Sequence, residues 1–362
     1  MRKSLGLVNQ SLRKRNGAFL LALTSLIIML VSCDLLSDAN QIPLLATPKK
    51  ILLQSASSIA GMIELAVSSN QDIVAVSSFD EPPGLWQKQN GQRLQIFQLN
   101  HQNCPAIPVT FSPDGKTLAT SISKNQIILW DVKSKAVKQT LNDPSVCGSQ
   151  MTFSSDSNTL AVGGQGNSVR LWEIKTGVLL HSLIMSSQVH RIDFSASEPV
   201  LNGADATGTV QQWNLKTGKL LRTLSNPQNT IWADGVFYPV AFSPNGKLMA
   251  RGDADKVIRV WSLETEKLIW TFPGHHDSIH AIAFSPNSEI LATVGDSGQS
   301  GALTGTSFHD LRLWNVQTGT ALGKSSDREY ITTLVFTPNG KELITGGNGG
   351  ELLLWDVEVL RP

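Results

Sequence analysis

Two stretches of the chain share one pattern. Residues 111–130 read FSPDGKTLATSISKNQIILW, and residues 336–355 read FTPNGKELITGGNGGELLLW. Each begins with phenylalanine, continues into a Pro-Asp-Gly or Pro-Asn-Gly turn, and ends in a tryptophan at the same distance from the phenylalanine. Proline presets φ for such a turn, and Asn and Gly tolerate the left-handed region of φ that a turn needs. Because short apolar segments separate the turns, the pattern predicts three consecutive β-strands.

The tryptophan of this pattern recurs at a regular interval of roughly forty to fifty positions. The seven copies are Trp86, Trp130, Trp172, Trp213, Trp261, Trp314 and Trp355. Six of them have a phenylalanine or valine at the fixed distance seen from Phe111 to Trp130, whereas the distance from Phe284 to Trp314 is longer. A period of this length indicates a repeat fold, and the longer interval indicates an insertion in the sixth repeat.

A fourth strand is expected in each repeat, after a turn such as Lys175-Thr176-Gly177. The repeats have no helical periodicity. A single four-stranded sheet cannot bury both of its faces, whereas seven sheets arranged radially bury each sheet between its neighbours. We therefore expect an all-β fold, a seven-bladed β-propeller of four-stranded antiparallel blades, with the seven tryptophans in the core between blades.

The repeats resemble those of the WD-repeat propellers over roughly residues 47–360. Trp130-Asp131 and Trp355-Asp356 match the dipeptide that names the family, and Gly274-His275 matches its Gly-His element. The resemblance implies a platform for binding other proteins. Members often hold the tryptophan through a His–Ser/Thr–Asp network. Aspartate stands six positions before the tryptophan only in repeats without Gly-His, so we expect no blade to complete this network.

The last repeat lacks a fourth strand of its own, since the chain ends at Pro362, soon after Trp355. Residues 49–55 (KKILLQS) lie before the first repeat and contain an apolar run at 51–53. This segment is either a disordered linker or the outer strand of the last blade. We expect the strand, which would join the two ends of the propeller.

The segment 1–32 differs in kind from the repeats. A basic start without acidic residues precedes an apolar run at 17–32, which is short for a membrane span and typical of a signal peptide. The run ends in Leu-Val-Ser-Cys, which resembles a bacterial lipobox and implies lipidation of Cys33. An uncleaved anchor is the alternative. We expect a lipoprotein signal peptide at 1–32, a tether at 33–46 and the propeller at 47–362, anchored by lipid to a bacterial cell membrane and facing the periplasm or the exterior.

Charge and cysteine content are consistent with that location. The full chain has 30 basic and 29 acidic residues, and without the basic residues of the leader the balance becomes mildly acidic. A mildly acidic domain without a basic stripe is a poor nucleic-acid binder, so we expect no such partner. Cys104 and Cys147 precede equivalent strands of adjacent repeats. Either a disulfide or two unlinked thiols fits this placement.

Both long insertions are expected on one face of the disc. In an antiparallel blade the second turn and the connection to the next blade share a face. The connection into blade five and the insertion at 295–309 in blade six both fall there, and loops on a rigid scaffold commonly bind partners. Aromatic residues in and near these segments are candidate partner contacts: Trp232, Phe237, Tyr238, Trp270 and Phe308. The alternative is that the loop aromatics only pack the loop onto the disc and that Trp270 covers the edge of its blade.

The sequence contains little that indicates catalysis. Residues 295–298 (GDSG) match a protease nucleophile segment, but without that fold the match is a coincidence. His275, His276 and His280 are close in sequence, yet no carboxylate or cysteine completes a metal set at a recognised spacing. We therefore expect no metal, no cofactor and no enzyme activity, but a noncatalytic protein-binding scaffold. The alternative is a lactonase-like or quinone-cofactor propeller that binds a small ligand in its central channel.

Overall fold

The computed structural model describes residues 42–53, 62–70, 72–78, 82–97, 108–123, 126–142, 150–163, 166–224, 239–253, 255–300, 307–325, 331–347 and 351–358. Several sequence-based predictions fall on other residues and so lie outside the described ranges. These are the signal peptide and Cys33, the pair Cys104 and Cys147, and the loop residues Trp232, Phe237 and Tyr238. No helix among the described residues is long and apolar enough to cross a membrane.

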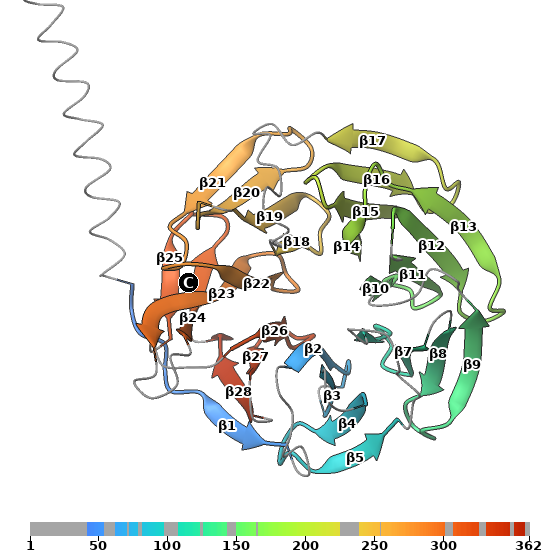
Figure 1. Ribbon diagram of the computed structural model, residues 1–362, viewed down its shortest axis with the longest axis horizontal. Helices are drawn as coiled ribbons and strands as arrows, with labels where there is room; N and C mark the ends of the chain where they lie inside the picture. The colour runs from blue at the N-terminus through green and yellow to red at the C-terminus, as the bar shows by residue number, and fades with distance from the viewer. Residues whose placement is uncertain are drawn as a thin grey trace, which may run out of the picture. The chain divides into compact units, whose positions relative to one another are not determined.

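The part of the chain from Leu44 onward is a closed ring of seven four-stranded antiparallel sheets (Figure 1). This confirms the predicted seven-bladed propeller. In each blade we letter the strands a to d from the centre outward. The strands are, in blade one, β2 (Met62–Val67), β3 (Ile73–Ser78), β4 (Gly84–Gln87) and β5 (Arg93–Ile96); in blade two, β6 (Val109–Phe111), β7 (Thr117–Ser123), β8 (Gln126–Asp131) and β9 (Val137–Asn142); in blade three, β10 (Gln150–Phe153), β11 (Thr159–Gly163), β12 (Ser168–Glu173) and β13 (Leu179–Ile184); in blade four, β14 (Val189–Phe194), β15 (Val200–Asp205), β16 (Val210–Asn214) and β17 (Leu220–Leu224); in blade five, β18 (Val240–Phe242), β19 (Leu248–Gly252), β20 (Ile258–Ser262) and β21 (Leu268–Phe272); in blade six, β22 (Ile279–Phe284), β23 (Ile290–Ser300), β24 (Ser307–Asn315) and β25 (Ala321–Lys324); and in blade seven, β26 (Thr333–Phe336), β27 (Glu342–Gly346), β28 (Glu351–Asp356) and β1 (Lys49–Leu52).

The N-terminal strand β1 closes the ring. It pairs antiparallel with β28, with Ile51 opposite Leu352, and so supplies strand d of blade seven. Ile51 is buried, whereas the next residue, Leu52, is 61% exposed. Successive side chains of a strand point to opposite faces, so β1 has one face against the core and one in solvent. The predicted joining of the two ends of the propeller is confirmed.

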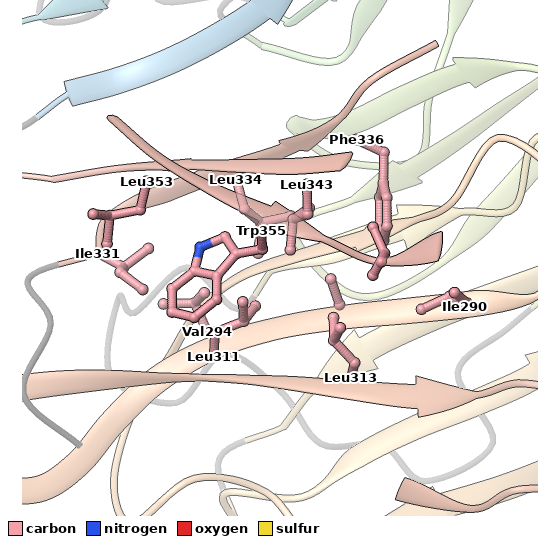
Figure 2. Packing of buried hydrophobic residues seen from close by; sticks show 12 residues of the cluster. Ile290, Val294, Leu311, Leu313, Ile331, Leu334, Phe336, Leu343, Leu353 and Trp355 are labelled. Atoms are coloured by element: carbon pink, nitrogen blue, oxygen red, sulfur yellow. The ribbon is translucent and has the colours of Figure 1, made fainter. Parts of the chain in front are cut away.

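The seven tryptophans all lie on c strands, as their fixed spacing from strand a predicted. Six of them are buried and Trp130 is partly buried. Figure 2 shows the core between blades six and seven, where the Trp355 indole lies among apolar side chains of both blades, including Val294 and Leu311. The seven repeat tryptophans therefore pack in the core between blades.

The a–b turns hold their shape through local hydrogen bonds. In blade two the Ser112 hydroxyl donates to the Asp114 carboxylate at 2.6 Å and accepts from the Thr117 backbone N–H at 3.0 Å. Gly115 follows with φ of 67°, in the left-handed region that glycine enters without steric cost. The same Ser/Thr-to-Asp/Asn bond recurs in blades three, five, six and seven. The repeated turn motif thus helps to set the register of strands a and b in these five blades.

Candidate functional site

The second hairpin of blade six is the longest in the described part of the propeller. Strand β23 has 11 residues and β24 has nine, whereas the corresponding strands of blade five have five each. Asp296 pairs with His309 near the base of the extension, and pairing resumes further out at Ser300 and Ser307. The predicted insertion therefore lengthens two strands of the blade.

A buried hydrogen-bonded chain lies beneath this extension. The Trp314 indole N–H donates to the Thr293 hydroxyl oxygen at 3.2 Å, and that hydroxyl lies 3.1 Å from His275 Nε2. His275 Nδ1 lies 2.5 Å from an Asp310 carboxylate oxygen, and the Arg312 Nε–H donates to the other oxygen at 2.7 Å. The expectation that no blade completes the His–Thr–Asp network is therefore wrong: blade six completes it. The aspartate stands four positions before the tryptophan, inside the lengthened strand β24, and not six positions before it.

The protonation states of His275 and Asp310 decide which groups donate and which accept in this hydrogen-bonded network. Burial lowers the pKa of His275, although the hydrogen bond to Asp310 acts the other way. Burial opposes ionisation of Asp310, but His275 and Arg312 outweigh it and its pKa lies below the usual value. The imidazole is therefore neutral and donates from Nδ1 to a carboxylate, while Nε2 accepts from Thr293. With each donor matched to an acceptor, the network stabilises the base of the hairpin.

Three further polar side chains, those of His280, Asp296 and His309, meet near this network, and His309 directly precedes Asp310 in the chain. His280 lies at a bulge in β22, where the pairing with β23 shifts between Ile279 and Ala281. A bulge re-aims the side chain of its extra residue. His280 Nε2 lies 3.1 Å from Asp296 Oδ1, and His309 Nε2 lies 3.4 Å from the same oxygen. These ligand-type atoms all lie within 4.8 Å of one another.

The surroundings hold this group in place. The Ser278 backbone N–H donates to Asp296 Oδ2 at 3.1 Å, and His309 Nδ1 bonds to the backbone carbonyl of Ile331. The two imidazole rings are 4.4 Å apart between centroids and inclined by 33°. Burial is the main cause that lowers the pKa of His309, and the neighbouring His280 acts in the same direction. The sequence did not reveal this group, because its members come from three different strands and are far apart along the chain.

The remaining aromatic candidates fall in two places. Phe308 is partly buried in β24, beside His309. Trp270 is partly buried in β21 of blade five, and its indole N–H donates to the Val316 carbonyl of blade six at 2.7 Å. Its ring also lies against Gly319, as the His181 ring of blade three lies against Gly218 of blade four. Trp270 therefore covers the edge of the neighbouring blade, the structural one of the two roles considered for it.

The innermost strands carry a small group of charged residues. Arg191 and Asp193 lie on β14 and form an ion pair at 2.7 Å, and Glu64 lies on β2. Both strands border the centre of the ring (Figure 1). Burial raises the pKa of Glu64 to about 7, partly offset by the Val109 N–H, which donates to it at 3.0 Å, and by Arg191. This group is relevant to the alternative of a ligand in the central channel.

Comparison with known proteins supports the repeat assignment. The family model described as "WD domain, G-beta repeat" matches residues 100–131, 138–173, 235–262, 266–299 and 318–356. The matched segments fall in blades two, three, five, six and seven.

Curated relatives match over about one quarter of the chain. It is 32% identical over 93 residues to "Apoptotic protease-activating factor 1" of Homo sapiens, covering 23% of the chain and 6% of that protein. It is 32% identical over 95 residues to "APC/C activator protein CDH1" of Saccharomyces cerevisiae, covering 25% and 15%. It is 26% identical over 86 residues to "Guanine nucleotide-binding protein subunit beta" of Solanum tuberosum, covering 24% and 22%. The matched regions thus span less than a quarter of each of these relatives.

Proposed function

Because the chain is a WD-repeat β-propeller, we propose that it is a noncatalytic scaffold that binds other proteins through the loop-bearing face of blades five and six. WD-repeat propellers generally bind other proteins. We choose this face because β23 and β24 are longer than the corresponding strands of the other blades. A rigid disc that presents one extended hairpin provides the kind of loop surface on which binding sites commonly lie.

The connection into blade five starts and ends on the same face of the ring. Strand β17 ends at Leu224 and β18 begins at Val240, and in an antiparallel blade both of these strand ends lie on the side of the b–c turns, as does the hairpin of blade six. Aromatic residues are enriched at the centres of protein interfaces, and this connection contains Trp232, Phe237 and Tyr238. We propose these three residues, together with Phe308, as partner contacts.

Loop-shortened variants test the proposed face. In one variant residues 225–238 are shortened and 298–306 are replaced by Asn-Gly, which keeps Asp296 and His309. A matched control carries Lys175→Glu and Lys216→Glu, two exposed positions in c–d turns on the opposite face. We expect affinity capture from membranes to recover the same partners with wild type and control, and to lose them with the shortened loops. Identical partner lists for all three proteins would refute the proposed face.

We further propose that Cys33 anchors the propeller to a bacterial membrane through lipid. The supporting observation is the basic leader, apolar run and Leu-Val-Ser-Cys ending of the segment 1–33. Several acyl chains give stable anchoring, whereas one chain is marginal. Metabolic labelling with a palmitate analogue should mark wild type and a Cys147→Ser control, but not Cys33→Ser. Equal labelling of Cys33→Ser would refute the anchor.

The charged group on β2 and β14 favours one alternative, a small-ligand site in the central channel. Titratable groups with shifted pKa values are enriched at functional sites, and Glu64 is such a group. A ligand bound there would raise the melting temperature of wild type but not of a Glu64→Gln, Arg191→Gln double variant. Equal ligand-induced shifts in the two proteins would exclude this channel group.

A further inference from the structure

We propose that His280, Asp296 and His309 bind one divalent transition-metal ion of the Zn²⁺ class at the base of the blade-six hairpin. The three side chains project from three adjacent strands of the blade, β22, β23 and β24. His280 is 34% exposed, whereas Asp296 and His309 are about 15% exposed. The group is therefore reachable from solvent but held mostly within the protein.

The carboxylate is oriented before any ion binds. The Asp296 backbone N–H donates to the Ser278 carbonyl at 3.0 Å, and the Asp296 carbonyl accepts from the His276 N–H at 2.8 Å. Asp296 Oδ2 accepts from the Ser278 N–H. These bonds leave Oδ1 directed at the two histidines. Partners of this kind, which orient a ligand without touching the metal, are usual in metal sites.

The orientation of His309 leaves a place for a cation. Its Nδ1–H donates to the Ile331 carbonyl, so in the neutral ring Nε2 carries a lone pair. That lone pair faces Asp296 Oδ1 at 3.4 Å, which is also an acceptor. Two acceptors that face each other repel unless a cation lies between them. A bound metal ion removes this repulsion and uses both lone pairs.

Two of the three separations in this group match those of a metal site, and the two histidine nitrogens lie within 4.8 Å of each other. Zinc binds histidine nitrogen and carboxylate oxygen at about 2.0–2.2 Å, which places two tetrahedral ligands roughly 3.3–3.5 Å apart. The observed separations from Asp296 Oδ1 are 3.1 Å to His280 Nε2 and 3.4 Å to His309 Nε2. Imidazole nitrogen favours Zn²⁺ and other late first-row transition metals over Mg²⁺ or Ca²⁺. Three protein ligands leave the fourth position open to water or to a side chain of another molecule.

Blade four provides an internal control. His190 occupies the same place in β14, where the pairing with β15 also shifts, between Val189 and Arg191. In that blade the residue at the position of Asp296 is Ala206, because Val189 pairs with Asp205 as Ile279 pairs with Gly295. His190 thus has the bulge position with an alanine in place of the aspartate, and the proposal assigns no metal to it.

The test uses the full-length protein in detergent, freed of metal with a chelator and titrated with Zn²⁺ near neutral pH by calorimetry. We expect one ion per chain, and a loss of affinity of at least tenfold in His280→Ala, Asp296→Asn and His309→Ala, with wild-type affinity in His190→Ala and His276→Ala. Co²⁺ should produce visible absorption bands of a low-symmetry, four- or five-coordinate site in wild type but not in Asp296→Asn.

Each outcome decides the matter. Absence of stoichiometric binding, or unchanged affinity in the three ligand variants, would overturn the proposal. Loss of binding in His276→Ala alone would place the ion elsewhere on the hairpin and would also overturn it. If Asp296→Asn and His309→Ala misfold, the result for His280→Ala still tests the proposal, because His280 is the most exposed of the three side chains. Partner capture is measured separately, so failure of the metal site and failure of the proposed docking face are distinguishable.

Discussion

The closure of the ring by β1 predicts a large difference between two neighbouring substitutions. Ile51 is 5% exposed and packs with residues of blades one and seven, including Val76, Leu352 and Leu354. Leu52 is 61% exposed on the other face of the strand. Replacing a buried Ile or Leu with Ala costs about 2–5 kcal/mol, whereas an exposed substitution usually changes stability by less than about 0.5 kcal/mol.

We therefore expect Ile51→Ala to lower the free energy of unfolding by about 3 kcal/mol and Leu52→Ala to leave it nearly unchanged. The measurement is urea unfolding followed by tryptophan fluorescence, with both the midpoint and the slope compared. The two variants remove the same number of carbon atoms from adjacent positions, so each controls for the other. Equal stabilities would refute the reasoning that β1 forms the outer strand of blade seven.

Two further predictions concern buried polar groups. Thr293→Val should destabilise the protein by about 2–4 kcal/mol, because it leaves both the Trp314 indole N–H and His275 Nε2 without partners. Thr345→Val in blade seven removes only the bond from Trp355 and should cost about 1–2 kcal/mol; equal losses in thermal or urea unfolding would contradict the additional bond between Thr293 and His275. Glu64 has a folded-state pKa of about 7 against an ordinary value of 4.5. Between these two pH values the folded protein therefore holds a proton on Glu64 that the unfolded chain has lost. Stability relative to Glu64→Gln should then fall by on the order of 2–3 kcal/mol as the pH rises from 4.5 through 7, and parallel pH profiles for the two proteins would contradict the raised pKa.

The predictions from sequence succeeded where the pattern was local and repeated. The fixed spacing from phenylalanine to tryptophan placed strands a and c, and the Pro-Asp-Gly turns placed the boundary between strands a and b. The closure of blade seven could be predicted from Ile51 and its neighbours, because a missing strand at one end matched an orphan apolar segment at the other. Each of these inferences needs only the period of the repeat and the rule that apolar edges become paired.

Predictions failed where a repeat departs from its period. The aspartate of the buried network was sought at a fixed distance from the tryptophan, but the longer strands of blade six move it to Asp310. For Trp270 the sequence left two roles open, because the choice between them depends on the turn of the next blade, which no spacing within its own repeat describes. Contacts of this kind between neighbouring blades are determined by how the blades pack.

The sequence by itself determined the number of blades, their strand order and the tryptophan core, because each follows from a short-range pattern repeated seven times. Only the tertiary structure decided which polar side chains meet. His280, Asp296 and His309 come together because a bulge turns one histidine and strand pairing aligns the other two residues. Their separations along the chain carry no recognisable motif, since contacts across a sheet depend on register and not on distance in sequence.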